Sequence, residues 1–301
     1  MPHLIVIGGP TASGKTSAAI QLANYLNCPI LSADSRQFFE EMNIGTAKPS
    51  HEELAKAQHF FINNKSITED YSAGVFEKEA LELLDEIFVA QQFAILVGGS
   101  GLYIDALCNG MDELPKDKNI RELYNIKFEK EGLDSLQKEL HKLDPEYFEI
   151  CDNQNPVRLI RALEIIKLSG KKISEQHKHK PKDRNFQCHH FILDWPREKL
   201  YERINARVDL MMASGLVEEV KTLMPYREKN ALQTVGYQEI FAFLDGQIDI
   251  NRAVALIKQN SRRYAKRQIT WFKKNAEALW VKPEEFDNPG QLMEQIGLNP
   301  N

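Results

Sequence analysis

Residues 9–16 read Gly9-Pro10-Thr11-Ala12-Ser13-Gly14-Lys15-Thr16 and match the pattern GxxxxGK[ST] at every fixed position. The apolar run Leu4–Ile7 precedes this stretch, and Thr16–Leu26, rich in Ala and Leu at helical spacing, follows it. A strand, a glycine-rich loop and a helix in this order form a phosphate-binding loop, whose backbone N–H groups and helix N-terminus point at phosphate oxygens. Lys15 adds a cation, and the Thr16 hydroxyl can bind Mg²⁺. We therefore expect a phosphate site in residues 9–16, with Mg²⁺ as cofactor.

Further apolar runs extend this pattern along the chain. Pro29–Ser32, Phe93–Val97 and Phe191–Leu193 read as strands, and Tyr71–Gln91 reads as a long helix between two of them. Strands that alternate with helices indicate a parallel, doubly wound sheet. The predicted fold class is α/β, with a P-loop NTPase-like parallel sheet core and a helical insertion domain.

The insertion is predicted from a change of pattern. From about Asp112 to Lys172 the sequence is charged and helical in period, with no convincing strand. The predicted organisation is a first part of the P-loop core at 1–111, a helical insertion at 112–188, and a second part of the core at 189–301 with basic C-terminal helices. Arg197–Ala213 and Asn251–Asn275 are the clearest helices of that last part.

Composition limits the class of protein. The chain has 301 residues, 43% of them hydrophobic, and no apolar run approaches the roughly 20 residues needed to cross a bilayer. We expect a cytoplasmic protein with no membrane partner. The four cysteines, which form no CxxC pair, read as reduced thiols: Cys28, Cys108, Cys151 and Cys188. The histidines around Cys188 lack the ligand spacing of a structural zinc site, so we interpret them as not binding metal: His177, His179, His189 and His190.

Charge is unevenly distributed. The net charge of −5 argues weakly against a nucleic-acid partner, yet residues 251–274 hold eight Lys or Arg and no acid. Residues 167–184 hold seven more basic residues against two acids. Arg263 and Arg267 are four apart, as are Arg262 and Lys266, so a helix would gather them into a basic stripe. The stripe favours an RNA-binding surface over a merely solvated face.

A phosphate loop does not by itself define a reaction. The strand Phe93–Val97 runs directly into Gly98–Tyr103 and carries no Asp where an NTPase would have its second metal-binding acid. Asp194, after Phe191–Leu193, is the alternative acid at a strand end, and its other interpretation is an ordinary turn residue.

Seven sequence blocks resemble those of the tRNA dimethylallyltransferases, in the same order and over nearly the whole chain. They are Gly9–Thr16 (GPTASGKT), Asp34–Gln37 (DSRQ), Ile44–Pro49 (IGTAKP), Gly98–Tyr103 (GGSGLY), Arg158–Glu164 (RLIRALE), Val235–Tyr237 (VGY) and Lys266–Trp271 (KRQITW). Ser100 stands where the family usually has Thr, which keeps the hydroxyl group.

The resemblance implies that the loop holds the diphosphate of dimethylallyl diphosphate, and that diphosphate is the leaving group. Negative charge then builds on the departing oxygens, where the loop N–H groups, Lys15 and Mg²⁺ would stabilise it. By resemblance Arg207 also reaches the diphosphate, and the Thr11 hydroxyl contacts the reacting centre.

The implied acceptor is N6 of the adenosine that is 3′-adjacent to the anticodon, with the tRNA anticodon arm as partner. The family's general base corresponds to Asp34, which follows the strand Pro29–Ser32 at the edge where open α/β sheets bind ligands. Its other interpretation is a turn or cap residue. The resemblance also implies that the insertion clasps the tRNA, and we expect the protein to act as a monomer.

Enzymes that modify a base extrude it into a pocket, so residues near Asp34 must receive the adenine and fill its gap. The residues that correspond to the family's tRNA contacts are Asp34, Ser35, Arg36, Gln37, Ser100, Arg121, Val157, Arg158, Leu159, Ile160, Arg161, Gln233, Thr234, Val235, Gly236, Tyr237, Gln238, Lys266, Arg267, Gln268, Ile269, Thr270, Trp271, Phe272 and Lys273.

Three other functions stay open at the level of sequence. They are a small-molecule kinase or other nucleotide-binding P-loop enzyme, a prenyltransferase that acts on free AMP or ATP, and a P-loop RNA-binding module without catalysis. The basic insertion and the block at 266–273 favour tRNA over a free nucleotide.

Overall fold

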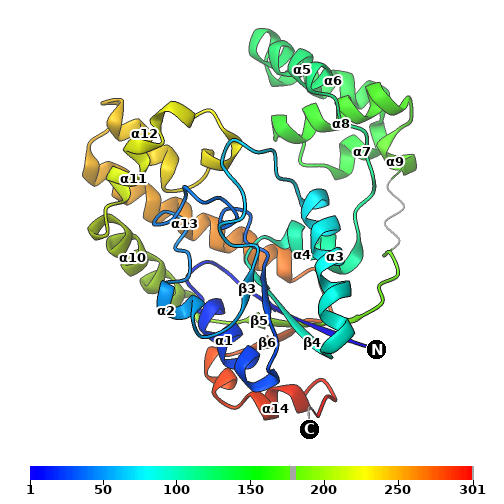
Figure 1. Ribbon diagram of the computed structural model, residues 1–301. Coiled ribbons are helices and arrows are strands. Elements are labelled where there is room, and N and C mark those ends of the chain that lie inside the picture. Colours follow the sequence, from blue (N-terminus) through cyan, green and yellow to red (C-terminus); the bar gives the residue numbers. More distant parts are fainter. Residues whose placement is uncertain (177–180, 300–301) are drawn as a thin grey trace. The chain divides into compact units, whose positions relative to one another are not determined.

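A computed structural model describes residues 1–176 and 181–299, and its centre is a six-stranded sheet with every strand parallel (Figure 1). The strands are β1 (His3–Gly8), β2 (Ile30–Ser32), β3 (His59–Phe60), β4 (Phe93–Gly98), β5 (Gln187–Leu193) and β6 (Leu279–Val281), in the spatial order β3-β2-β4-β1-β5-β6. All six residues of β1 are buried, as expected for a central parallel strand covered on both faces. The predicted α/β class is confirmed.

Helices cover both faces of this sheet. The helices of the core are α1 (Lys15–Leu26), α2 (His51–Leu54), α3 (Ala73–Ala90), α4 (Gly101–Asn109), α10 (Arg197–Ala213), α11 (Leu216–Thr222), α12 (Tyr237–Leu244), α13 (Ile250–Phe272) and α14 (Pro289–Glu294), with short 3-10 turns at Met224–Tyr226, Asn230–Leu232 and Pro283–Asp287. Side chains alternate along β1, so Ile5 and Ile7 pack with α1 and α14, whereas Leu4 and Val6 pack with α3 and α4. A separate apolar cluster around Tyr237 joins α10, α11, α12 and α13.

The chain divides into two compact units, Met1–Asn109 with Asp183–Asn301, and Gly110–Lys182. The second unit contains α5 (Lys118–Glu131), α6 (Leu133–Leu143), α7 (Pro145–Ile150), α8 (Pro156–Ser169) and α9 (Ile173–Gln176). Its own core includes Leu136, Leu140, Leu159 and Leu163, all of them fully buried. We call it the helical unit, and the larger part the core unit.

The second boundary differs from the one at 188 that the sequence predicts. Arg184 donates hydrogen bonds to the backbone oxygens of Leu107 and Ala106 and forms an ion pair with Glu77, at 2.8 Å. These contacts tie residues 183–188 to the core unit, a link that the charged sequence alone does not reveal. His177 and His179, considered above as metal ligands, lie outside the described residues.

Most sequence-predicted elements lie within a few residues of the observed ones. The helix expected at Tyr71–Gln91 begins at Ala73, because the Ser72 side chain accepts a hydrogen bond from Val75 N and caps it. The strands β3 and β6 were not predicted, since two or three residues are too few to show a periodic pattern. No helix in the described part of the chain is long and apolar enough to span a membrane.

Candidate active site

The phosphate loop lies at the carboxyl end of β1, the central strand, and leads directly into α1. Gly14, which precedes the helix, has a left-handed backbone with φ of +92° that glycine adopts without steric cost. Ala12 has φ of +63°, which is uncommon for a residue with a side chain and costs free energy. The surrounding contacts must therefore hold the loop in this shape.

Two side chains distant in sequence provide such contacts. Buried Gln268 of α13 accepts a hydrogen bond from Thr11 N and donates one to Gly99 O, both at 2.8 Å, and so links the phosphate loop to the turn after β4. From the other side, Trp195 Nε1 donates to Ser13 O at 2.8 Å. Arg203 stacks on Trp195 and donates to Ala12 O at 2.8 Å. Sequence reasoning missed Trp195 and Arg203, and assigned Gln268 to tRNA contact only.

Two cations face the loop. Lys15 Nζ donates to Pro10 O at 2.8 Å, and burial lowers the pKa of Lys15 to about 8, against the attraction of Asp34. Burial also lowers the pKa of Arg207, which acts on Lys15 as a neighbouring positive charge. Two like charges held together in a partly dry site favour an anion between them.

Unpartnered polar atoms support the same conclusion. In the described part of the chain, the buried side-chain atoms that lack a hydrogen-bond partner are Ser13 Oγ and Arg207 Nε. Leaving a buried donor unsatisfied costs about 1–3 kcal/mol, so such atoms call for a ligand. The loop, Lys15 and Arg207 are thus suited to bind a compact, multiply charged anion such as diphosphate.

Asp34 lies beside this anion site, two residues after β2. Its Oδ1 accepts a hydrogen bond from Arg36 N at 3.1 Å, the short-range turn contact that its other interpretation predicted. Its Oδ2 has no hydrogen-bond partner among residues 1–176 and 181–299. Electrostatic interactions link Asp34 with Lys15 and Arg207. The turn contact therefore orients the carboxylate and leaves one oxygen available for chemistry.

Aromatic and hydroxyl groups lie near Asp34. Burial lowers the pKa of Arg36, which interacts with Tyr103, Tyr264 and Asp34. Burial, together with the negative charge of Asp34, raises the pKa of Tyr264 to about 12. Ser100 Oγ accepts from Ser35 N at 3.0 Å and donates to Ser35 Oγ at 3.1 Å. Tyr103 and Tyr264, which sequence reasoning missed, offer aromatic rings beside a carboxylate, a setting suited to a flat base.

The Ile44–Pro49 block connects these groups. Gln37 Nε2 donates to Thr46 O at 3.3 Å, and Arg207 Nη2 donates to the same oxygen at 3.2 Å. Glu219 of α11 accepts from the backbone N–H groups of residues 43–45 at 2.7–3.0 Å and from the hydroxyl of buried Tyr237 at 2.7 Å. Glu219 therefore shapes the loop whose Thr46 carbonyl accepts from Arg207. Sequence reasoning missed Glu219.

Thr16, the predicted magnesium ligand, could hold Mg²⁺ only together with the phosphates of the substrate. Thr16 is half-buried in the first turn of α1, next to Lys15. β4 ends at Gly98 without an acid, and Asp194 is exposed after β5. One hydroxyl suits Mg²⁺, which keeps several waters and is usually bound through one or two protein ligands and the substrate phosphates.

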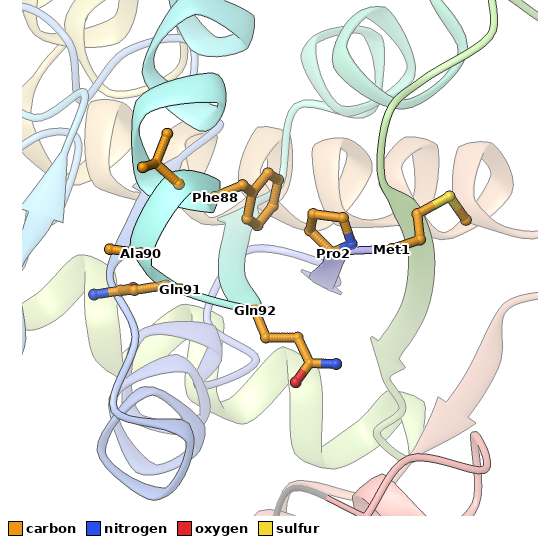
Figure 2. Close-up of a pocket in the computed structure, with 7 residues that line it drawn as sticks. Met1, Pro2, Phe88, Ala90, Gln91 and Gln92 are labelled. Carbon is orange, nitrogen blue, oxygen red and sulfur yellow. The ribbon is translucent and has the colours of Figure 1, made fainter.

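The hollow in Figure 2 lies elsewhere. It is lined by Met1, Pro2, Phe88, Val89, Ala90, Gln91 and Gln92. These residues adjoin the amino ends of β1 and β4, whereas ligands of open parallel sheets bind at the carboxyl ends. The hollow also lacks a catalytic side chain, so we do not assign the active site to it.

The predicted tRNA contacts of α13 and residues 233–238 divide by exposure. Gln268, Phe272, Gly236 and Tyr237 are buried, so in this structure they support the fold instead of presenting a surface. Thr234, Val235, Ile269 and Trp271 are half-buried, and Trp271 Nε1 donates to Asp105 at 2.8 Å. The exposed members are Gln233, Gln238, Lys266, Arg267, Thr270 and Lys273. A tRNA contact by any of them stays a prediction.

In the helical unit a buried acid engages two of the predicted RNA contacts. Glu164, which is fully buried, forms ion pairs with Arg121 at 2.7 Å and with Arg161 at 2.8 Å. Leu159 and Ile160 belong to the core of the unit. Exposed Val157 and Arg158 are therefore the members of this set best placed to meet a partner.

The fold and this site define a class: a P-loop protein of the α/β type whose loop is suited to an anion and lies beside a carboxylate with a free oxygen. A family model described as IPP transferase matches residues 37–275. The chain belongs to the IPP transferase family.

Similarity to individual proteins agrees with this. A tRNA dimethylallyltransferase of Christiangramia forsetii is 51% identical over 286 residues, which cover 95% of this chain and 94% of the relative. One of Flavobacterium johnsoniae is 50% identical, covering 93% of each chain. The crystal structure of a tRNA isopentenylpyrophosphate transferase of Bacillus halodurans has a TM-score of 0.72 at 34% identity, over 98% of this chain and 96% of that one. A eukaryotic dimethylallyltransferase acting on tRNA has a TM-score of 0.80 at 25% identity, over 98% of this chain and 78% of that one.

Proposed function

We propose that this protein transfers a dimethylallyl group from dimethylallyl diphosphate to N6 of the adenosine 3′-adjacent to the anticodon of tRNA, releasing diphosphate. The observation that carries the proposal is the grouping of Lys15, Arg207 and Asp34, with buried donors that lack partners on the anion side. The relatives named above, which act on tRNA as their names state, support the same reaction.

The site residues divide the reaction between them. The loop N–H groups, Lys15 and Arg207 hold the diphosphate and stabilise the charge that develops as the bond to the allyl carbon breaks. Mg²⁺, held by Thr16 and the diphosphate, would add Lewis-acid stabilisation of the leaving group. The adenine N6 lone pair forms the new bond to that carbon. The nitrogen is then cationic, and the free oxygen of Asp34 takes its proton.

Residues next to these groups position the adenine and the prenyl donor. Gln268 holds the Thr11 backbone, and we propose that the Thr11 hydroxyl contacts the reacting centre. Ser35, Arg36 and Gln37 follow Asp34 directly, and we propose that they line the pocket of the extruded base together with Ser100. The tRNA anticodon arm then meets the exposed cations of α13 and Arg158. We also propose that the protein acts in the cytoplasm as a monomer.

The decisive experiment incubates the protein and Mg²⁺ with labelled dimethylallyl diphosphate and one acceptor at a time: unmodified tRNA, the same tRNA with guanosine 3′ of the anticodon, AMP, or ATP. We expect label only in the first tRNA, at N6 after digestion to nucleosides, with one diphosphate released per transfer. Label on AMP or ATP would indicate a free-nucleotide prenyltransferase. Turnover of ATP alone would indicate a kinase, and tRNA binding without transfer an RNA-binding module.

A further inference from the structure

A cluster of metal-ligating side chains lies in the core unit, outside the residues assigned to catalysis. One donor atom each of Cys108, Cys188 and His190 lies within 4.8 Å of the other two. Cys108 is buried near the end of α4, and the other two residues are half-buried on β5. All three residues belong to the described ranges 1–176 and 181–299.

The fold brings these residues together by two simple rules. Cys188 and His190 are two apart on a strand, so their side chains point to the same face of the sheet. On that face β5 packs with α4, because Cys108 and Cys188 share an apolar cluster with Leu4 and Val6. His189 points to the opposite face, where its Nε2 lies 3.0 Å from His3 Nδ1. The donor atoms of two residues on a strand and one on a helix therefore lie close enough together to bind one ion.

The chemistry of this set suits a borderline-soft divalent metal. Burial and the nearby His189 lower the pKa of His190 to about 4, so its imidazole is neutral at pH 7, the form that binds metal. A hydrogen bond with Cys188 and burial raise the pKa of Cys108 well above its ordinary value, so Cys108 is a thiol before the metal binds. Asp105 and Arg184 act on Cys108 with opposite charges. A divalent cation with two thiolates is neutral overall and suits this balanced, buried setting.

We propose that Cys108, Cys188 and His190 bind one Zn²⁺ ion, with water in the fourth position of a tetrahedron. Binding releases two protons, one from each thiol, and forms two Zn–S bonds and one Zn–N bond. The ion ties α4 to the middle of β5. Because α4 starts at Gly101, directly after Ser100, the ion would brace the helix that begins within the GGSGLY block. The sequence spacing of His190 does not indicate such a site, because Cys108 joins the set only through the packing of α4 on β5. The ion lies outside the residues assigned to catalysis and takes no part in the transfer reaction.

A disulfide between Cys108 and Cys188 is the competing use of the two sulfurs. Both cysteines are free thiols in this structure. A disulfide would involve Cys108 and Cys188 alone and leave the half-buried His190 without a bonding partner in the cluster, whereas a metal binds all three groups. A disulfide would also need an oxidant, and reduced thiols are the norm inside cells.

The test is a titration of metal-free, reduced protein with Co²⁺ as a spectroscopic probe, followed by displacement with Zn²⁺. We expect one Co²⁺ per chain with intense thiolate-to-cobalt charge-transfer absorption and tetrahedral d–d bands, all of which disappear on adding Zn²⁺. Cys108→Ser and Cys188→Ser should abolish the charge-transfer band or halve its intensity, and His190→Ala should weaken binding. The matched controls Cys28→Ser and Cys151→Ser remove thiols elsewhere and should leave the spectrum unchanged.

A second measurement uses only the unaltered protein, so it tests the proposal even if the variants fail to fold. In the unaltered protein, Zn²⁺ should release about two protons per ion at pH 7 and raise the Tm by about 5 °C at a hundred-fold excess over its Kd. Absence of charge-transfer absorption, an unchanged spectrum in both Cys108→Ser and Cys188→Ser, or Zn²⁺ binding without proton release would each overturn the proposal. So would isolation of the protein from reducing buffer with a Cys108–Cys188 disulfide that excludes the metal.

Discussion

The two oxygens of the Asp34 carboxylate have different surroundings. Oδ1 accepts a hydrogen bond from Arg36 N, which orients the group, and Oδ2 is free among the residues described. Turn geometry and catalysis are therefore compatible uses of one side chain.

Asp34→Asn keeps the size of the group and its acceptor oxygen for Arg36 N, but removes the base. We expect single-turnover transfer to fall by about 10²–10⁴-fold, with tRNA affinity nearly unchanged. Rapid-quench measurement of transfer and a separate binding assay check this. Asp287→Asn, an exposed aspartate that accepts from Gln21, is the matched control. Unchanged transfer by Asp34→Asn would rule out Asp34 as the base.

Lys15 links the site to pH. Burial lowers its pKa to about 8, so the free protein carries the cation below that pH and loses it above. Affinity for the prenyl diphosphate should therefore fall as pH rises through about 8, by up to about tenfold per pH unit once the lysine is neutral. Lys15→Arg, which stays charged, should flatten this decline, whereas Lys15→Ala and Thr16→Ala should weaken donor use at every pH. A donor affinity that does not change between pH 7 and 10 in the unaltered protein would contradict the assignment.

At the scale of the element, α13 has two faces of different character. Its buried face carries Gln268 and Phe272, which contact the phosphate loop and the sheet. On the other face Arg263, Lys266 and Arg267 are exposed. Lys258, one turn before this stripe, forms an ion pair with Asp209 of α10 at 2.6 Å, so an acid from another helix compensates this cation. Arg263, Lys266 and Arg267, which form no ion pair with the residues that the structure describes, lie in the C-terminal half of the helix.

The double variant Arg263→Ala with Arg267→Ala should weaken tRNA binding and reduce the slope of log affinity against log salt, by about 0.7–0.9 for each phosphate that the protein no longer neutralises. Donor binding and Tm should be unchanged, because both side chains are exposed. The control variant Lys56→Ala with Lys78→Ala removes the same charge from exposed positions elsewhere. An unaltered salt slope in a stable protein would mean a solvated face, and a lowered Tm would mean that the arginine stems pack.

At the scale of the whole molecule, the core unit and the helical unit each have a hydrophobic core of their own. Glu164 adds an internal anchor to the helical unit, where it holds Arg121, Arg161 and the backbone of Asp117. The anion site lies wholly in the core unit. Loss of packing in one unit should therefore be separable from loss of function in the other.

Leu140→Ala opens a cavity in the helical unit and should destabilise it by about 2–5 kcal/mol. Hydrogen exchange should then rise in α5, α6 and α8, while affinity for the prenyl diphosphate stays normal and tRNA affinity falls. Leu84→Ala makes the same change in the core unit and should lower the stability of the donor site instead. Equal loss of donor affinity in both variants would contradict the independence of the two cores.

The sequence alone determined the features that depend on neighbouring residues. The phosphate loop, the alternating strands and helices, the helical insertion and the placement of Asp34 after a strand all follow from local pattern, because loops, strands and helices are short-range structures. Only the tertiary structure decided which distant groups meet. It joined Gln268 to Thr11, gave Arg121 and Arg161 a common partner in Glu164, and brought Cys108 to Cys188 and His190. These pairings come from the packing of elements that are far apart along the chain. Burial of apolar faces drives that packing, and because the hydrophobic effect has no preferred direction, the apolar pattern of one element does not say which other element it will meet.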